Sequence, residues 1–466
     1  MKQAATANPR VVRFPTHLAR GWASFTLLGL ALATGVKAEM GPPFSRREDP
    51  IVLRGADAAT FRGAPLRALR MLAVRDGAPV PIPFQIDPCD ATGAPLLEWV
   101  REREGRPWTA NPARAAHPNL EDRDEIVLLA RDLGPRLPSD ALPDREAVEI
   151  EALDPLDGAR AYAYLVRRAT DAPASDTDYV AYNPETRVVR SRELAYGRTD
   201  PKHPAVVNYL AVGDGENLLR GLHTPVRITA VFGAVGINRD ENDVETRLRG
   251  YTDGSIRVLL RQESRIAGVL LIRGDWVERL LVNYPTRVEI PTRAHVPLRP
   301  GVVITRATAD LVIELTAAAE GGEIRHAALE TPLRIESGAA PFQQDLPESS
   351  EHEFTLLGAF GGLFIRYRED ARFTQSGIAR RFFFQPGAGG DGGASDSAHR
   401  FGLQISKIED LPRGNYEFRI VLCGRRDFRP GEEEEFRRIE AVPLKISVGD
   451  VAGGLGAATP QPEFTP

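Results

Sequence analysis

Residues 226–232 read VRITAVF and residues 255–261 read SIRVLLR, and this alternation of aliphatic and polar side chains decides the fold. Successive side chains of a strand point to opposite faces, so the aliphatic residues can pack in a core while the arginines meet water. The turn Asp253-Gly254 separates two such segments. We predict further strands of the same kind at residues 244–251, 269–272, 279–282, 287–290 and 302–304.

The region before this one is also built from short strands. Residues 80–87 read VPIPFQID, in which apolar residues occupy one face and two prolines the other, as suits an edge strand. Residues 126–130 (IVLLA) predict a buried strand. Residues 147–153 and 161–166 flank a turn rich in Pro, Asp and Gly and predict a hairpin. Short strands at this spacing favour a sandwich over an alternating α/β fold.

The expected fold class is therefore all-β and mainly antiparallel, with a small β-sandwich followed by a larger β-sandwich or supersandwich. Helical periodicity is confined to the neighbourhood of residues 324–329. Turn-rich stretches set the predicted boundaries, which are a signal peptide at 1–38, a linker at 39–44, the first sandwich at 45–168, a linker at 169–178, the larger sandwich at 179–448 and a disordered tail at 449–466.

The first residues have the layout of a secretory signal. Four basic residues and no acidic ones precede the apolar segment 22–33, which is shorter than a membrane-spanning helix needs to be. Small side chains at Val36 and Ala38 predict cleavage before Glu39. We expect a periplasmic or extracellular protein, with no membrane span in the mature chain because charged residues or proline interrupt every later apolar run.

Charge excludes one class of partner. The full chain has a formal net charge of -5, and loss of the five basic residues before position 39 makes it more negative still. An acidic surface repels phosphate backbones, so nucleic acid is not expected as a partner. A glycan or another envelope protein is the expected kind of partner.

Two cysteines, Cys89 and Cys423, lie in opposite halves of the chain. Their spacing leaves open whether they pair in an oxidising compartment. Neither belongs to a C-x-x-C pattern, which argues against thiol redox work, haem attachment and a cysteine zinc site.

The first candidate cluster joins Gln85 and Asp87 to an acidic run at Asp122, Asp124 and Glu125. If the two strands are neighbours in one sheet, these carboxylates can share a proton or a cation and form a binding site. The alternative is an edge strand that ends in a polar turn beside an acidic loop, without any function.

The second candidate is the segment 238–245 (NRDENDVE), in which Asp240, Asn242 and Asp243 provide the oxygen ligands that Ca²⁺ prefers. The EF-hand pattern fails, because Asp243 stands where glycine is needed and Arg249 where the closing glutamate is needed. A solvated turn is the alternative, and no other cofactor is expected.

The third candidate is a set of residue types that polysaccharide lyases use, in which Tyr or His removes a proton beside a carboxylate that Arg or Asn neutralises. The set comprises His203, Asn208, Tyr209, His223, Tyr251, Arg247, Arg249 and Arg257. These positions equally fit the ordinary polar faces of strands, and their spacing distinguishes neither reading. No G-x-S-x-G, phosphate-binding glycine loop or H-E-x-x-H is present.

Three short motifs carry a resemblance to known families. Residues 80–87 (VPIPFQID) and 124–134 (DEIVLLARDLG) resemble uncharacterised exported bacterial proteins that share a PVPFQID-type strand and a DELV strand. Residues 253–257 (DGSIR) are similar to a turn of exo-rhamnogalacturonan-lyase-like sandwich proteins. The second resemblance implies a sandwich fold and a glycan substrate, but transfers no catalytic residue.

Two functions follow as expectations. The first is a non-catalytic cell-envelope or ligand-binding protein, since no catalytic spacing is present. The second is a carbohydrate-active enzyme, lyase-like and acting on an acidic glycan. The binding residues that we select for test against the structure are Gln85, Asp87, Asp124, His223, Tyr251 and Arg257.

Overall fold

The computed structural model describes residues 46–103, 105–138, 146–201, 206–230, 235–240, 243–266, 277–296, 304–387 and 398–450. Predictions for the signal peptide, the first linker and the tail from 451 onward lie outside these residues. The fold class is confirmed, because antiparallel sheets dominate and helices are few and short. No helix among the described residues is long and apolar enough to cross a bilayer.

A small sandwich is formed mainly by the first third of the chain. Its three-stranded sheet has the order β1-β7-β4 and its five-stranded sheet the order β3-β2-β9-β8-β30. The strands are β1 (Pro50–Arg54), β2 (Leu69–Arg75), β3 (Ala78–Pro81), β4 (Gln85–Asp87), β7 (Glu125–Leu129), β8 (Ala147–Leu153), β9 (Arg160–Arg167) and β30 (Lys445–Asp450). The apolar side chains between the sheets include Ile51, Met71, Ile126, Ile150 and Ile446.

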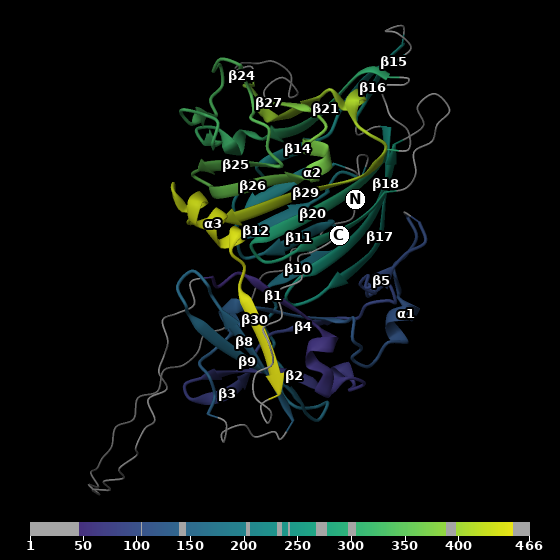
Figure 1. Cartoon of the computed structure of the whole chain (residues 1–466), viewed down its shortest axis with the longest axis vertical. Helices are drawn as coiled ribbons and strands as arrows, with labels where there is room; N and C mark the ends of the chain where they lie inside the picture. Colours follow the sequence, from purple (N-terminus) through teal and green to yellow (C-terminus); the bar gives the residue numbers. More distant parts are fainter. Residues whose placement is uncertain are drawn as a thin grey trace, which may run out of the picture. The chain divides into compact units, whose positions relative to one another are not determined.

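The last strand of the chain completes this first sandwich. β30 pairs antiparallel with β8, and Figure 1 shows it in yellow beside the bluish strands β8 and β9. Leu444 and Ile446 are buried in the small core because alternate residues of the strand point inward. The predicted linker at 169–178 therefore does not separate the two sandwiches completely, because residues 445–450 return to the small one.

The larger sandwich places an eleven-stranded sheet against sheets of seven and four strands. The eleven-stranded sheet has the order β23-β22-β25-β26-β29-β20-β19-β18-β17-β5-β6. Its strands are β5 (Trp99–Val100), β6 (Thr109–Ala110), β17 (Val244–Asp253), β18 (Val258–Ile266), β19 (Val277–Asn283), β20 (Arg287–Val296), β22 (Glu323–Arg325), β23 (Leu333–Arg334), β25 (Glu351–Gly358), β26 (Gly361–Glu369) and β29 (Gly414–Arg425).

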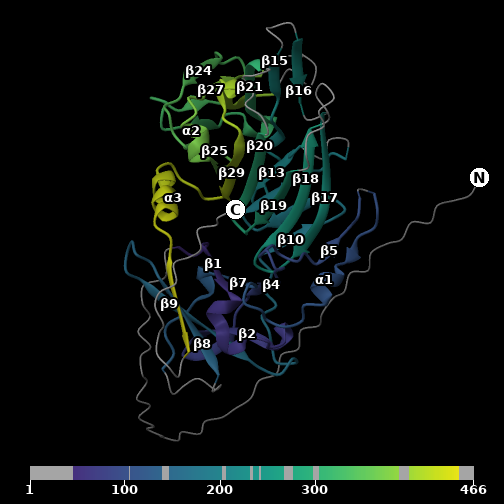
Figure 2. The same cartoon turned by 45° about the vertical axis from the view of Figure 1, so that its right-hand side comes forward.

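The two facing sheets have fewer strands. The four-stranded sheet consists of β10 (Val180–Asn183), β11 (Val188–Ser191), β12 (Leu194–Gly197) and β13 (Tyr209–Val212), and the seven-stranded sheet of β14 (Leu219–His223), β15 (Val226–Ala230), β16 (Val235–Arg239), β21 (Ile304–Leu315), β24 (Phe342–Asp345), β27 (Ala379–Gln385) and β28 (Arg400–Ser406). Figure 2 shows β10 beside β17 and β18, and β13 packs against β26 of the same large sheet. One continuous core, with Tyr182, Leu260, Leu311 and Phe354 among its members, joins all three sheets.

In the part of the chain that the structure describes, three short α-helices connect strands: α1 (Pro112–Ala115), α2 (Ala371–Thr374) and α3 (Glu432–Ala441). The helical periodicity predicted at residues 324–329 is wrong, since residues 323–325 form β22, where Ile324 is buried as the middle residue of a strand. The helix lies instead at α3, whose first turn carries four glutamates, a favourable arrangement at the positive end of a helix.

β7 joins the two sandwiches because each of its two faces packs in a different hydrophobic cluster. All five of its residues are buried. Ile126 and Leu128 point into the small core, while Val127 and Leu129 pack against Leu259 of the large sheet. A strand that is buried on both faces reads as a continuous apolar run, which is the pattern seen at residues 126–130.

We predict that replacing Ile446 with Ala will lower the free energy of unfolding by about 2 to 5 kcal/mol, because a nearly inaccessible side chain leaves a cavity in the small core. Urea denaturation monitored by circular dichroism would measure the change. Lys445→Ala is the matched control, since its exposed side chain is on the opposite face, and equal effects of the two substitutions would contradict the placement of β30.

Two histidines at the edge of the large core, the partly exposed His326 and the buried His352, give a pH-dependent prediction. His326 stacks on Phe354 with ring centroids 4.8 Å apart, and His352 lies 6.2 Å from His326. Burial lowers the pKa of each to about 4. Because the pKa in the unfolded chain is near 6.5, the unfolded state binds more protons between these values.

The histidines should therefore stabilise the fold fully above pH 6.5 and less as the pH falls toward 4. We expect thermal denaturation to show a smaller loss of stability on acidification in the double variant His326→Phe/His352→Phe than in the wild type. Comparing the two proteins cancels the titration of carboxylates elsewhere. Parallel pH profiles for the two would refute the prediction.

Candidate functional site

A groove of about 780 Å³ lies where β1 of the small sandwich approaches β20, β29 and α3 of the large one. Ligand pockets in proteins commonly have this size. The groove is lined by six arginines and six carboxylates, which are Arg46, Arg287, Arg293, Arg368, Arg372 and Arg419, and Asp49, Glu289, Glu369, Asp370, Glu417 and Glu440. Their formal charges cancel.

Strand periodicity places these charges on one face of the sheet. In β20 the residues Arg287, Glu289 and Arg293 share a face, whereas Val288 and Ile290 point into the core and are almost fully buried. On β29, Glu417 lies directly opposite Arg293. β20 pairs with β19 at Val288 and Glu289, shortly before Pro291, which has no N–H for a ladder bond.

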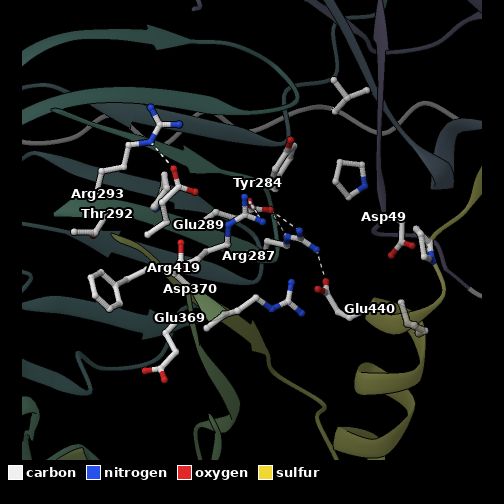
Figure 3. A pocket seen from close by; sticks show the side chains of 18 of the residues that line it. Asp49, Tyr284, Arg287, Glu289, Thr292, Arg293, Glu369, Asp370, Arg419 and Glu440 are labelled. Carbon is white, nitrogen blue, oxygen red and sulfur yellow. Dashed lines mark hydrogen bonds and ion pairs between the residues drawn. The ribbon is translucent and has the colours of Figure 1, made fainter. Parts of the chain in front are cut away.

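Arg287 is the central cation of the groove. Its Nε donates to Glu289 Oε1 at 2.8 Å, and its Nη1 donates to Glu440 Oε1 of α3 at 2.5 Å. Figure 3 shows the Arg287 guanidinium between these two carboxylates. Burial alone would raise the pKa of Glu289, but Arg287 and Arg419 outweigh it and lower that pKa. Glu289 is therefore held as a carboxylate.

Asp49 has the opposite tendency. Burial raises its pKa, against the opposing charges of Arg46 and Arg287. Arg46 Nε donates to Asp49 Oδ2 at 2.7 Å, and Arg46 also donates to the carbonyl of Ile439 at 2.9 Å. Arg46 thus fastens the beginning of β1 to the last turn of α3. Asp49 therefore retains its proton more readily than an ordinary aspartate, whereas Glu289 loses its proton more readily than an ordinary glutamate.

The rim of the groove is more accessible than its floor. Arg293 Nε lies 3.0 Å from Glu417 Oε1, and just over half of the Arg293 side chain is exposed. Arg372 donates to Asp370, which caps α2 by accepting from the backbone N–H of Arg372. Phe418 is half-buried beside them and stacks on Tyr367, with centroids 6.3 Å apart. The rim offers charged groups and one aromatic side chain.

The structure brings together the first predicted cluster, but in the interior. β4 pairs with β7, so Asp87 lies opposite Glu125. Arg257 joins them: its Nε donates to Asp87 Oδ2 at 2.9 Å and its Nη2 donates to Glu125. All three side chains are nearly inaccessible to solvent. We call Gln85, Asp87, Glu125, Arg257 and Tyr284 the Arg257 network.

The remaining groups of the Arg257 network are also partnered. Gln85 Nε2 donates to both oxygens of Asp87, and Gln85 Oε1 accepts from the backbone N–H groups of Ile256 and Arg257 at 3.1 and 3.0 Å. Gly254 allows this approach, because a Cβ there would lie 2.2 Å from the Gln85 amide. Arg257 Nη1 donates to the Tyr284 hydroxyl at 3.3 Å. The geometry is that of a structural junction.

Asp124 lies apart from this network. It accepts from the backbone N–H groups of Cys89 and Glu121 at 2.9 and 2.8 Å, and His117 Nε2 lies 3.1 Å from it. Asp124 is fully buried and organises the loop that precedes β7. Asp122 pairs with Arg62 on the surface at 2.6 Å.

The other predicted binding residues are dispersed. His223 Nε2 lies 3.2 Å from Glu314 on the seven-stranded sheet. Tyr251 belongs to an aromatic cluster, with ring centroids 4.9 Å from Trp108 and 5.0 Å from Tyr182, and burial raises its pKa. The lyase-type set is therefore not assembled at one place among the described residues, and His203 lies outside them.

The predicted calcium loop is described in part. Asp243 accepts from Arg239 Nη1 and from the backbone N–H of Asp240, both at 3.2 Å, while Asn242 lies outside the described residues. No group of three His, Cys, Asp or Glu side chains suited to a metal ion occurs in the described segments. A calcium site here stays a prediction.

Both cysteines are buried free thiols in the structure, with pKa values raised by burial. Cys89 belongs to the loop after β4 and Cys423 to β29, where it lies opposite Arg287.

Sequence reasoning missed the groove itself. One signal was available, since residues 287–293 alternate charged and apolar side chains as RVEIPTR and place Arg287, Glu289 and Arg293 on one face. The partners Asp49 and Glu440 come from opposite ends of the chain and belong to no motif. Their approach depends on the packing of β1 and α3, which spacing does not reveal.

Neither the family models nor the curated proteins searched contain a match to this chain. Among solved structures, the chain is similar to an α-mannosidase from Enterococcus faecalis V583, with a TM-score of 0.44 and 7% identity over 87% of this chain and 44% of that one. A glycosyl hydrolase family 38 protein from Enterococcus faecalis gives 0.44 and 8% over 87% and 46%. The Slr1438 protein from Synechocystis sp. PCC 6803 gives 0.30 and 9% over 56% and 100%. The chain thus spans less than half of the two Enterococcus structures.

We predict that Arg257→Met will lower the free energy of unfolding by about 3 to 5 kcal/mol, because it leaves Asp87 buried without a cation and leaves Glu125 with only the partly exposed Arg54 at 3.0 Å. Thermal denaturation and urea denaturation would both measure the loss of stability. Arg192→Met is the control, since 89% of that side chain is exposed and its removal should change stability by no more than about 0.5 kcal/mol. Equal stability of the two variants would be incompatible with a structural junction.

Proposed function

We propose that the protein is an exported, non-catalytic protein that binds a glycan in the groove between β1, β20, β29 and α3. The observation that carries this proposal is the exact balance of six arginines and six carboxylates along the lining. Export rests on the secretory layout of residues 1–38.

A balanced lining suits a polyhydroxylated ligand better than a polyion. A charged polymer is attracted by an excess of the opposite charge, whereas the arginines and carboxylates of this groove largely neutralise one another. An arginine has five N–H donors and a carboxylate about four acceptor sites, so an ion pair such as Arg293 with Glu417 retains capacity for further hydrogen bonds. Sugar hydroxyls both donate and accept, and match such pairs.

The rim adds an apolar contact. Phe418 is half-buried and lines the groove beside Arg293 and Arg419. The C–H faces of a sugar ring pack on aromatic side chains, while the hydroxyls at its edge reach neighbouring polar groups. This combination supports recognition of a saccharide. The resemblance of residues 253–257 to lyase-like sandwich proteins is consistent with the same class of ligand.

Binding without chemical change is supported by the state of the groove tyrosine. A lyase needs a base that removes a proton beside a carboxylate. Burial raises the pKa of Tyr284, its side chain is nearly inaccessible, and its hydroxyl accepts a hydrogen bond from Arg257. Tyr284 therefore has a structural role rather than that of a catalytic base. No histidine that could serve as the base is among the described residues that line the groove.

Glycoside hydrolysis in the same groove is a second candidate. The pKa of Asp49 is raised and that of Glu289 is lowered, and carboxyl groups whose pKa values are shifted apart are the usual acid and base of such enzymes. In this mechanism Asp49 is the general acid that protonates the leaving oxygen, and Glu289 is the ionised carboxylate that serves as nucleophile or general base. Asp49→Asn would abolish the activity.

We predict that the purified protein binds at least one polysaccharide from a panel of neutral and uronic-acid glycans, measured by isothermal titration calorimetry. Arg293→Gln and Phe418→Leu should each weaken binding about tenfold or more, and Arg192→Gln, far more exposed and outside the groove lining, should not. Affinity should change little when salt rises from about 50 mM to about 500 mM, because the lining is balanced.

Product analysis of the same mixtures separates the two candidates. New reducing ends that disappear in Asp49→Asn would establish hydrolysis, and absorbance from unsaturated sugars would establish a lyase. Absence of binding to every glycan in the panel, or unchanged affinity in both rim variants, would overturn the proposed function.

A further inference from the structure

A second hollow lies inside the large sandwich, between the four-stranded sheet and strands β17 and β18. Its volume is about 30 Å³, and it is lined by Tyr182, Arg187, Arg198, Thr246, Gln262 and two leucines. A space of this size holds one or two water-sized species. It is separate from the groove, and none of these residues lines both.

The hollow is lined by cations and by uncharged side chains. Arg198 contributes to the lining, and no carboxylate is among the described residues that do. Arg279 of β19 lies directly opposite Gln262 in the antiparallel ladder, so the two side chains are neighbours on one face of the sheet. Burial, followed by the charge of Arg198, lowers the pKa of Arg279 to about 10. The positive charges of Arg198 and Arg279 are therefore close enough to influence each other, although both side chains are partly exposed.

The polar atoms at this position lack partners. The Nε atoms of Arg198 and Arg279, the hydroxyls of Tyr182 and Tyr196, and Oε1 of Gln262 are buried without a hydrogen bond. Tyr196, Tyr182 and Gln262 are only 1%, 5% and 1% exposed. Among the described residues, neither Arg198 nor Arg279 forms an ion pair, although Arg198 lies over the Tyr196 ring at 6.0 Å.

Such an arrangement is costly without a counterion. Each buried donor that lacks an acceptor destabilises a fold by an amount comparable to a lost hydrogen bond or more, and the neighbouring positive charges of Arg198 and Arg279 repel each other. Four of the groups are donors: two guanidinium N–H groups and two phenolic O–H groups. The Gln262 amide can turn so that Nε2 faces the hollow, while Oε1 accepts from the Ser264 hydroxyl, which already lies 3.0 Å from the amide.

We propose that this hollow binds a small monovalent inorganic anion, for which chloride is the representative, between Arg198, Arg279, Tyr182 and Gln262. The volume excludes a sugar and favours an ion of about the size of a water molecule. A bound anion would accept from N–H and O–H donors of both facing sheets. It would thereby fasten β10 and β12 onto β18 and β19.

Thermal denaturation in chloride and in gluconate at equal ionic strength tests the site. Chloride and bromide should raise the Tm of the wild type saturably, by about 3 °C at concentrations near one hundred times the dissociation constant. Arg279→Met should remove the difference between chloride and gluconate, since it removes one of the two cations while keeping a side chain of similar length. Arg192→Met is the control. Because 89% of the Arg192 side chain is exposed, this variant should keep the difference in Tm between chloride and gluconate.

A direct observation complements the variants. In crystals of the wild type grown or soaked in bromide, we expect an anomalous peak bounded by Tyr182, Arg198 and Gln262. This measurement decides the matter even if Arg279→Met fails to fold. Equal Tm values in chloride and gluconate together with no anomalous peak would overturn the site, as would an unchanged chloride effect in Arg279→Met. Neither result bears on glycan binding in the groove.

Discussion

The burial of a single guanidinium between two carboxylates is the constraint on which the arrangement of the two sandwiches depends. Arg257 follows the turn between β17 and β18 of the large sheet, whereas Asp87 and Glu125 belong to β4 and β7 of the small one. A buried ion pair is specific because a displaced partner leaves an unpaired charge in a medium of low dielectric constant. The register between β4, β7 and the β17–β18 turn is thus fixed by electrostatics as well as by packing.

The groove depends on that register. β1, which contributes one wall, pairs with β7 along its whole length, and β7 carries Glu125. Tyr284 lines the groove and accepts from Arg257, so one hydroxyl belongs to both the junction and the groove. On the opposite side, Arg46 and Arg287 hold α3 through its carbonyl of Ile439 and its side chain of Glu440. The groove is consequently bounded by elements that are far apart in the sequence and are held by arginine.

Much of the fold could be predicted from alternation, and much of the site could not. The sequence left open whether residues 85–87 and the acidic run before residue 126 are neighbours, and Asp87 does lie opposite Glu125. The single edge strand predicted at residues 80–87 is wrong, because residues 78–81 form β3 of one sheet and residues 85–87 form β4 of the other. Arg257, which pairs with both carboxylates, was a candidate only as part of the lyase-type set. Its pairing with Asp87 and Glu125 could not be predicted, because a single sequence contains no sign of contacts between such distant residues. The same limit applies to Glu440 and Asp49. Periodicity reports which face a side chain occupies, but not which distant segment covers that face.

The pairing of β30 with β8 has a consequence for the order in which the molecule can form. The small sandwich contains most of the first residues to be synthesised, yet its sheet presents an open edge at β8 until residues 445–450 arrive. Contacts so distant along the chain close late in folding, because loop-closure entropy must be overcome first. In a nascent chain, the small sandwich therefore stays incomplete until residues 445–450 have been synthesised, and the backbone groups at the edge of β8 stay open to pairing with other chains until then.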